Sequence, residues 1–208
     1  MNILYAGTPN PSAKILKALC DNPSINVVGV ITKPDKAQKR GNKLVQSPVS
    51  IEAQNRNLNI FKPDDLNAIK LKQSIEALNV DFIVVAAYGK ILPKWLLGLP
   101  KIMPINIHYS LLPKYRGASP IQSSLLNGDR ISGITFMKMS EELDDGDCIK
   151  QYELNIKNNH NKITLEKDLC DLSITKIFGI LDMVKEEKYT LVEQDNDSAT
   201  YCKKIHKS

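Results

Sequence analysis

The sequence lacks the features that mark several common protein classes. Its four cysteines are widely separated and form no C-x-x-C pair, which argues against a zinc site or a redox motif. No apolar run approaches the roughly 18 residues that a membrane-spanning helix needs, so no contact with a membrane is expected. The first residues, MNILYAGTP, have neither a charged n-region nor a long apolar h-region, so we expect no signal peptide. These absences predict a cytoplasmic protein with reduced thiols.

Several ligand-binding motifs are also missing. The first turn, GTPNPS, has no G-x-G-x-x-G pattern, so a dinucleotide is not implied, and no G-x-x-x-x-G-K-[ST] motif indicates a P-loop NTPase. The acidic residues form no D-x-D-x-D-G ladder of the kind that binds calcium. We therefore expect no metal site.

The bulk composition fits one globular domain. The chain has 208 residues, of which 42% are hydrophobic and 25% charged, as in ordinary α/β domains. A net charge of +5 permits a polyanionic partner without demanding one. The composition changes near residue 190. We therefore predict a single domain over residues 1–189, followed by a short strand and a linker or tail over residues 190–208.

Apolar patterns alternate between strand and helix periods along most of the chain. Strands are predicted within 2–9, 25–32, 59–61, 80–89, 103–108, 131–140 and 148–156, and helices within 11–21, 49–57, 65–78, 118–128 and 164–188. Residues 33–48 are predicted to form a long loop. The segment 80–89 is almost continuously apolar, which is typical of a central parallel strand. The pattern predicts an α/β fold: an open, doubly wound, mostly parallel and Rossmann-like sheet with helices on both faces.

Two polar residues follow one another on the strand that ends at residue 108. Asn106 and His108 are two positions apart, so both side chains point to one face of the strand. Paired donors suit an oxygen that gains negative charge during a reaction, and a histidine can carry a proton near neutral pH. A structural asparagine beside a partly exposed histidine is the alternative.

Two charged segments accompany this strand. The acidic turn SEELDDGD, residues 140–147, supplies five carboxylates, one of which could orient His108; spacing does not say which, and the turn could equally be solvated. The predicted loop carries cations that either are solvated or contact the phosphates of a nucleic acid. They are Lys33, Lys36, Lys39, Arg40 and Lys43.

Taken together, these motifs resemble the folate-dependent formyltransferases. The resemblance rests on Asn106 and His108 followed by SLLP at 110–113, RGA at 116–118 and LDDGD at 143–147. The segments AGTP, PDKAQKRGNKLVQSPV, AAYGKILP and GASPIQ are similar to those of members that act on methionyl-tRNA. The resemblance runs from Met1 to about residue 205 and implies the family's Rossmann-like fold.

The resemblance also implies roles. The formyl donor would be 10-formyltetrahydrofolate and the partner initiator methionyl-tRNA, with no metal and a monomeric enzyme. Asn106 and His108 would stabilise a tetrahedral oxyanion, while Asp144 would orient His108 and assist proton transfer from the amine. The donor would contact Tyr88, Gly89, Lys90, Ile91, Leu92, Ser110, Leu111, Leu112 and Pro113, and the tRNA would contact Lys39, Arg40 and Lys43. Members of this kind normally continue into a C-terminal β-barrel that helps to bind the tRNA, and we expect that domain to be absent from this chain.

Three other functions remain open from the sequence. The acceptor could be a small amine, such as an amino sugar or glycinamide ribonucleotide. The same fold could pass the formyl group to water as a 10-formyltetrahydrofolate hydrolase. A catalytically idle module that binds folate or RNA is the third.

Overall fold

The computed structural model describes residues 1–37 and 44–205. The chain divides into two compact units, Met1–Pro104 and Ile105–Ser208. Each unit contains its own strands and helices.

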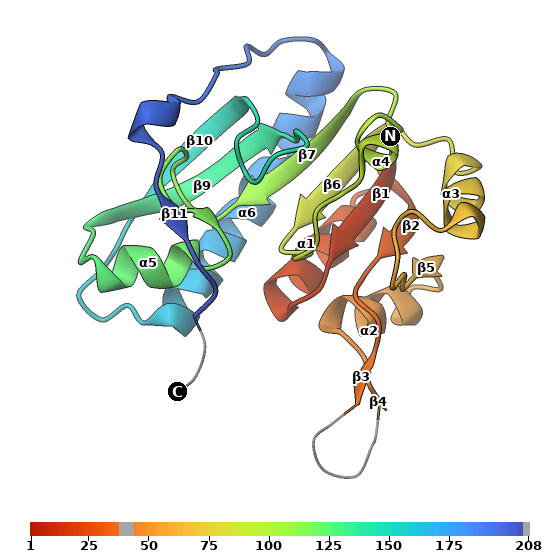
Figure 1. Ribbon diagram of the computed structural model, residues 1–208, viewed down its shortest axis with the longest axis horizontal. Helices are drawn as coiled ribbons and strands as arrows, with labels where there is room; N and C mark the ends of the chain where they lie inside the picture. The colour runs from red at the N-terminus through yellow and green to blue at the C-terminus, as the bar shows by residue number, and fades with distance from the viewer. Residues whose placement is uncertain (38–43, 206–208) are drawn as a thin grey trace. The chain divides into compact units, whose positions relative to one another are not determined.

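The first unit is built on parallel strands. Its elements are β1 (Asn2–Gly7), α1 (Asn10–Asp21), β2 (Asn26–Ile31), β3 (Lys36–Ala37), β4 (Leu44–Val45), α2 (Pro48–Asn55), β5 (Ile60–Phe61), α3 (Ile69–Glu76), β6 (Phe82–Ala86) and α4 (Lys94–Leu97). Four of the strands lie in the order β6-β1-β2-β5, and each neighbouring pair is parallel (Figure 1). All five residues of β6 are buried, as its continuous apolar sequence predicts.

Helix α1 shows how sequence fixes local structure in this unit. Pro11 stands in its first turn, where a missing backbone N–H costs nothing. Ile15, Leu16 and Leu19 recur at helical spacing and are fully buried. The helix packs against β1, β2 and α2.

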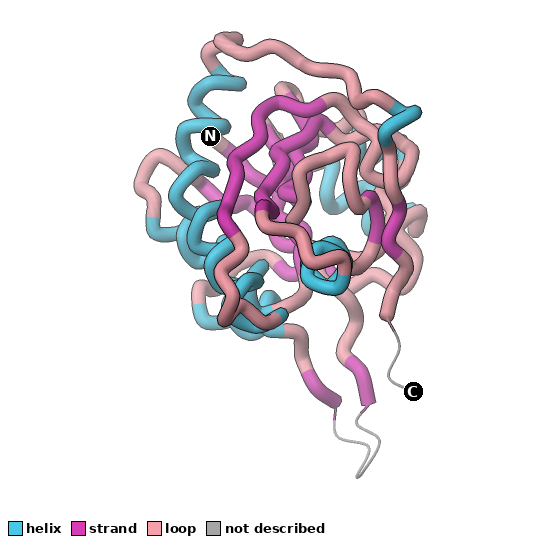
Figure 2. Tube along the Cα trace, turned by 90° about the vertical axis from the view of Figure 1, so that its left-hand side faces the viewer, coloured by secondary structure: helices cyan, strands magenta, loops and turns pink. Residues whose placement is uncertain are grey.

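Three details of the first unit differ from the sequence prediction. The segment predicted as a loop contains β3 and β4, which pair antiparallel and are the two lowest strands in Figure 2. Helix α4 was not predicted, because four residues are too few to show a helical period. Helix α3 begins at Ile69, four residues later than predicted.

The second unit has an antiparallel sheet covered by a long helix. Its elements are β7 (Met103–His108), which starts at the boundary, β8 (Arg116–Gly117), α5 (Pro120–Leu126), β9 (Ile131–Lys138), β10 (Cys148–Asn155), α6 (Lys162–Lys185), η1 (Asn196–Ser198) and β11 (Tyr201–Cys202). Strand β9 lies between β7 and β10 and is antiparallel to both. Helix α6 packs on β9 and β10, behind them in Figure 1. The α/β class is confirmed: β6, β1, β2 and β5 pair in parallel in the first unit, and β7, β9 and β10 pair antiparallel in this one.

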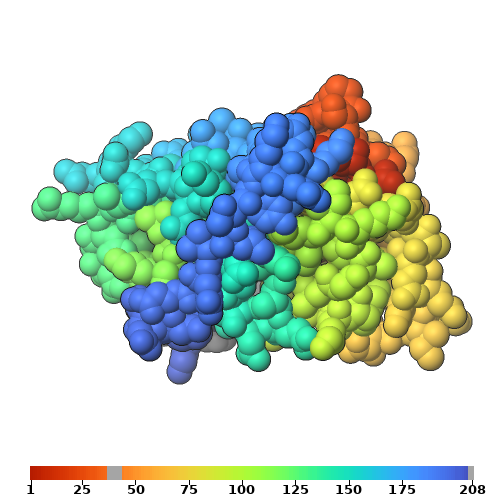
Figure 3. All heavy atoms as spheres, turned by 90° about the horizontal axis from the view of Figure 1, so that it is seen from above, coloured from red at the N-terminus to blue at the C-terminus, as the bar shows by residue number. Residues whose placement is uncertain are grey.

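The last residues of the second unit pack against earlier parts of the same unit. Strand β11 pairs parallel with β8, and Val192 forms a bridge with Cys148. In Figure 3 the blue end of the chain borders teal atoms from the middle of the second unit. The polar composition of residues 190–205 indicated only a short strand and a tail, because hydrogen bonds to distant residues leave no periodic pattern.

Candidate active site

Asn106 and His108 lie at the carboxyl end of β7. Strand β9 pairs beside them, with Asn106 opposite Met137 and His108 opposite Thr135. The two side chains are only 8% and 6% exposed. Ile107, between them, is also buried, so the polar pair is held within a rigid strand rather than on a loop.

Asp144 joins these two residues. Its Oδ1 accepts a hydrogen bond from Nδ2 of Asn106 at 3.2 Å, and its Oδ2 lies 3.6 Å from Nδ1 of His108. Oδ2 also accepts from the backbone N–H of Gly117 at 2.9 Å. The acidic turn supplies several carboxylates, and the structure identifies Asp144 as the one that faces both polar residues of β7.

The ring of His108 has a second partner. Its Nε2 lies 2.9 Å from the backbone carbonyl oxygen of Tyr115. A carbonyl oxygen can only accept, so Nε2 carries the hydrogen in this contact. Nδ1 is therefore the ring nitrogen that faces Asp144, and at 3.6 Å the two groups are too far apart for a hydrogen bond.

The backbone around Asp144 adopts conformations that most residues avoid. Asp144 has a φ of +51° and Tyr115 a φ of +61°, both in the left-handed region. Gly117 has a φ of +113°, and a Cβ there would lie 2.5 Å from the carbonyl oxygen of Cys202. Such residues concentrate at functional sites, where surrounding structure holds them.

The predicted donor residues of the second unit follow β7. The hydroxyl of Ser110 donates to the carbonyl of Lys114 at 2.6 Å, and its carbonyl accepts from Oγ1 of Thr135 at 2.7 Å. Leu112 packs with Met137 and Cys148, and the Leu112–Pro113 peptide is cis.

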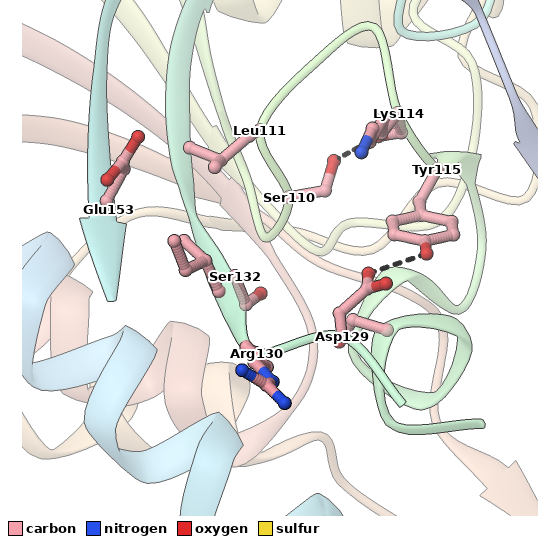
Figure 4. Close-up of a pocket in the computed structure, with 10 residues that line it drawn as sticks. Ser110, Leu111, Lys114, Tyr115, Asp129, Arg130, Ser132 and Glu153 are labelled. Carbon is pink, nitrogen blue, oxygen red and sulfur yellow. Dashed lines mark hydrogen bonds between the residues drawn. The ribbon is translucent and has the colours of Figure 1, made fainter. Parts of the chain in front are cut away.

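A pocket of about 360 Å³ opens beside Ser110 and Leu111 (Figure 4). Its wall carries charges of both signs, including Lys114, Arg130 and Glu153. Asn106, His108 and Asp144 are not among its lining residues, so the pocket is separate from their cluster.

The other predicted donor residues, Tyr88 to Leu92, lie in the first unit. Tyr88 is 1% exposed, and its hydroxyl has no hydrogen-bond partner among the described residues. Burial raises the pKa of this hydroxyl to about 12. Its backbone carbonyl accepts from Oγ1 of Thr8 at 3.0 Å.

The four residues after Tyr88 have different surroundings. Gly89 has a φ of +73°, and a Cβ there would meet Nζ of Lys33 at 2.4 Å. Nζ of Lys90 donates to the carbonyls of residues 63 and 64, whereas Ile91 is 67% exposed and Leu92 is buried. The structure shows the local setting of each residue, and their contact with a donor stays a prediction.

Some predictions concern other parts of the chain. Lys39, Arg40 and Lys43 lie outside the described residues. Within the described ranges, no three side chains of the metal-binding types gather into a site. No described helix is both long enough and apolar enough to cross a bilayer.

Sequence reasoning missed three groups of this site. The backbone N–H of Gly117 and the carbonyl of Tyr115 are main-chain partners, which no side-chain motif reveals. Gln194 donates to the carbonyls of Asp144 and Gly146 from a segment that looks like a polar tail. No signal in the sequence distinguishes this glutamine from a solvated one.

Comparison with known proteins gives both a family and a fold. The family model described as "Formyl transferase" matches residues 1–178. Relatives named methionyl-tRNA formyltransferase, from Sulfurihydrogenibium sp. and Thermotoga neapolitana, are 40% and 41% identical over the whole of this chain. The chain spans 67% and 66% of those two relatives, about two thirds of their length.

A solved structure shares the fold at lower identity. Glycinamide ribonucleotide transformylase 1 from Symbiobacterium toebii aligns with a TM-score of 0.75 at 17% identity, over 94% of each chain. The predicted fold class is thereby confirmed. At this identity the likeness concerns the fold alone.

Proposed function

The chain belongs to the formyl transferase family, and we propose that it transfers a formyl group from 10-formyltetrahydrofolate to the amino group of initiator methionyl-tRNA. The family membership confirms the resemblance seen in the sequence. The observation that supports the proposed chemistry is the cluster of Asn106, His108 and Asp144, in which the carboxylate faces both other side chains.

Formyl transfer to an amine requires that negative charge develop on the formyl oxygen. The amine nitrogen attacks the formyl carbon, and the carbonyl becomes a tetrahedral oxyanion. Asn106 donates one amide hydrogen to Asp144, which leaves the second for the oxyanion. A preorganised donor of this kind contributes roughly 10²–10³ in rate. His108 supplies a further electropositive group when its ring is protonated.

The attacking amine must also lose a proton. A carboxylate has about four lone-pair sites, and the described contacts of Asp144 with Asn106 and Gly117 use two of them. Asp144 can therefore accept the proton and pass it towards the leaving nitrogen of the donor. Positioned proton transfer contributes roughly 10²–10⁴ in rate.

The partners are proposed from the family resemblance. We assign contacts with the donor to residues 88–92 and 110–113, and contacts with tRNA phosphates to Lys39, Arg40 and Lys43. Phosphate contacts position a nucleic acid without reading its sequence. The proposed enzyme acts in the cytoplasm as a monomer.

A small amine is the second candidate acceptor. The cluster of Asn106, His108 and Asp144 would serve either amine, because the chemistry at the formyl carbon is the same.

Incubation with 10-formyltetrahydrofolate labelled in its formyl group tests the acceptor. Separate reactions contain methionyl-initiator tRNA, glycinamide ribonucleotide, a nucleotide-linked amino sugar, or no amine. Uncharged initiator tRNA is the matched control, since it keeps every phosphate and lacks only the amine. We expect label on methionyl-tRNA alone. Label on a small amine, or formate release without an amine, would replace the proposed acceptor.

A further inference from the structure

Gln194 connects the end of the chain to the turn that holds Asp144. Its side chain is 5% exposed, and Nε2 donates to the backbone carbonyls of Asp144 at 2.9 Å and Gly146 at 2.7 Å. Its Oε1 accepts from Nε of Arg116 at 3.0 Å. Both amide hydrogens and the amide oxygen are therefore used, so the orientation of this side chain is fixed.

The two carbonyls that Gln194 binds directly follow a strained point of the backbone. Asp144 has a φ of +51°, a conformation that a non-glycine residue keeps only when its surroundings hold it. One side chain bridges the carbonyls of residues 144 and 146, and so fixes the backbone from which the Asp144 carboxylate projects. The backbone direction in turn decides whether that carboxylate reaches Asn106 and Gly117.

Arg116 completes a closed set of contacts. It is 2% exposed, and its guanidinium donates to three uncharged oxygens, of Gln194, Asn196 and Tyr201. A buried cation needs such partners, because burial without them is costly. The next residue, Gly117, donates its N–H to Oδ2 of Asp144. The path from Asp144 through Gln194, Arg116 and Gly117 therefore returns to the same carboxylate.

We propose that Gln194 is a positioning residue for the Asp144 carboxylate, and that Arg116 holds it in place. The expected effect on turnover rests on the proposed function. The positioning of the carboxylate rests only on the hydrogen bonds described above. Gln194 donates hydrogen bonds to two carbonyls of the turn, and Arg116 donates one to the glutamine oxygen. The N–H of Gly117 donates to the carboxylate. Removal of the two carbonyl contacts lets the turn relax and moves the carboxylate away from Gly117 and Asn106.

Two substitutions separate this role from simple attachment of the chain end. Gln194→Met keeps the length of the side chain and removes all three hydrogen bonds. Gln194→Glu keeps an acceptor for Arg116 but, when ionised, cannot donate to the carbonyls. Ser119→Ala is the matched control, because the Ser119 hydroxyl donates to the carbonyl of Lys203 and anchors the same segment without contacting Asp144.

Amide hydrogen exchange gives a readout that does not depend on activity. The N–H of Gly117 reports on the carboxylate, whereas the N–H groups of Arg116 and Ala118 donate to the carbonyls of Thr200 and Cys202 and report on the docked chain end. We expect both Gln194 variants to speed exchange at Gly117 by about tenfold, as loss of one hydrogen bond implies, with Arg116 and Ala118 unchanged. The Ser119 variant should leave Gly117 protected.

Turnover gives the second readout. Misplacement of a reacting group by about 1 Å costs up to roughly 10² in rate, so we expect kcat to fall by about tenfold to a hundredfold in both Gln194 variants. The KM for the donor should stay within about twofold. Equal loss of protection at Arg116, Gly117 and Ala118 would overturn the proposal, as would unchanged protection at Gly117. Faster exchange at Gly117 alone, in a protein that formylates no acceptor, would support the positioning role and refute the proposed function.

Discussion

Nε2 of His108 lies 2.9 Å from the carbonyl oxygen of Tyr115, and this contact decides which ring nitrogen faces the carboxylate. Because the carbonyl cannot donate, Nε2 keeps its hydrogen in both protonation states of the ring. Nδ1 therefore gains or loses the proton, beside Oδ2 of Asp144 at 3.6 Å. The lone pair of the neutral ring therefore lies on the side of Asp144.

This arrangement predicts the neutral tautomer of His108. Long-range ¹H–¹⁵N spectra of the neutral ring should show a protonated Nε2 and an unprotonated Nδ1. His160 serves as an internal reference, because its Nδ1 accepts from the N–H of Lys157 at 3.1 Å and its Nε2 faces Asp168. A His108 that carries its hydrogen on Nδ1 would contradict the arrangement.

The close surroundings of Gly117 predict that one added methyl group there lowers the free energy of unfolding strongly. Gly117→Ala would place Cβ 2.5 Å from a backbone oxygen at a φ of +113°. Gly128 also has a positive φ, +67°, but no described atom lies within 4 Å of the position that an alanine Cβ would take there. We expect Gly128→Ala to lower the free energy of unfolding by about 1 kcal/mol, and Gly117→Ala to lower it by at least about 3 kcal/mol. Urea titration measures both, and similar decreases would show that the pairing of β8 with β11 carries little stability.

Tyr88 predicts a specific dependence of stability on alkaline pH. The pKa of its buried hydroxyl is about 12 in the folded chain, against roughly 10 in the unfolded chain. Between these values the folded state keeps a proton that the unfolded state has released, so stability falls as pH rises. The contribution is fully present below about pH 10.

Tyr88→Phe should remove this part of the alkaline decrease in stability. It should cost little at neutral pH, because the hydroxyl has no hydrogen-bond partner among the described residues. The measurement is the thermal unfolding midpoint of the parent protein and of the variant at a series of pH values. The series runs from about pH 8, below both pKa values of the hydroxyl, to about pH 12. Parallel pH curves would show that Tyr88 ionises equally in both states.

The proposed phosphate contacts of Lys39, Arg40 and Lys43 predict how the affinity for tRNA depends on salt concentration. The logarithm of the association constant for tRNA falls linearly with the logarithm of the salt concentration. Removing one cation that binds a phosphate should make this slope shallower by about one unit. We expect this for Lys39→Gln and for Arg40→Gln. Lys188→Gln removes an exposed charge paired with Glu186 and is the control. Slopes that do not change in the first two variants would refute the assignment of this segment to tRNA.

The sequence predicted the parts of the fold and of the site that depend on local pattern. The run of buried residues in β6 and the helical spacing in α1 gave those elements correctly. Asn106 and His108 could be paired because a strand alternates its faces every second residue. The structure places them, with Asp144, in one cluster.

The remaining parts depend on contacts between distant segments. Gln194 reaches Asp144 across 50 positions of the chain, and Tyr115 contributes only a backbone carbonyl. Neither contact has a sequence pattern. The two-residue strands β8 and β11 likewise form only because the chain end returns to Arg116.

The rate of a single turnover in Asp144→Asn tests the central claim most directly. Asparagine has nearly the same shape and tolerates the φ of +51° at this position, so the variant should keep its fold. Its thermal midpoint should fall slightly, because one amide oxygen can accept from only one of Asn106 and Gly117. It cannot accept the amine proton. With the enzyme in excess over methionyl-tRNA and saturating 10-formyltetrahydrofolate, we predict formyl transfer at least about 10² slower than in the parent protein. A folded variant that transfers formyl at the parent rate would contradict the assignment of Asp144 to the reaction.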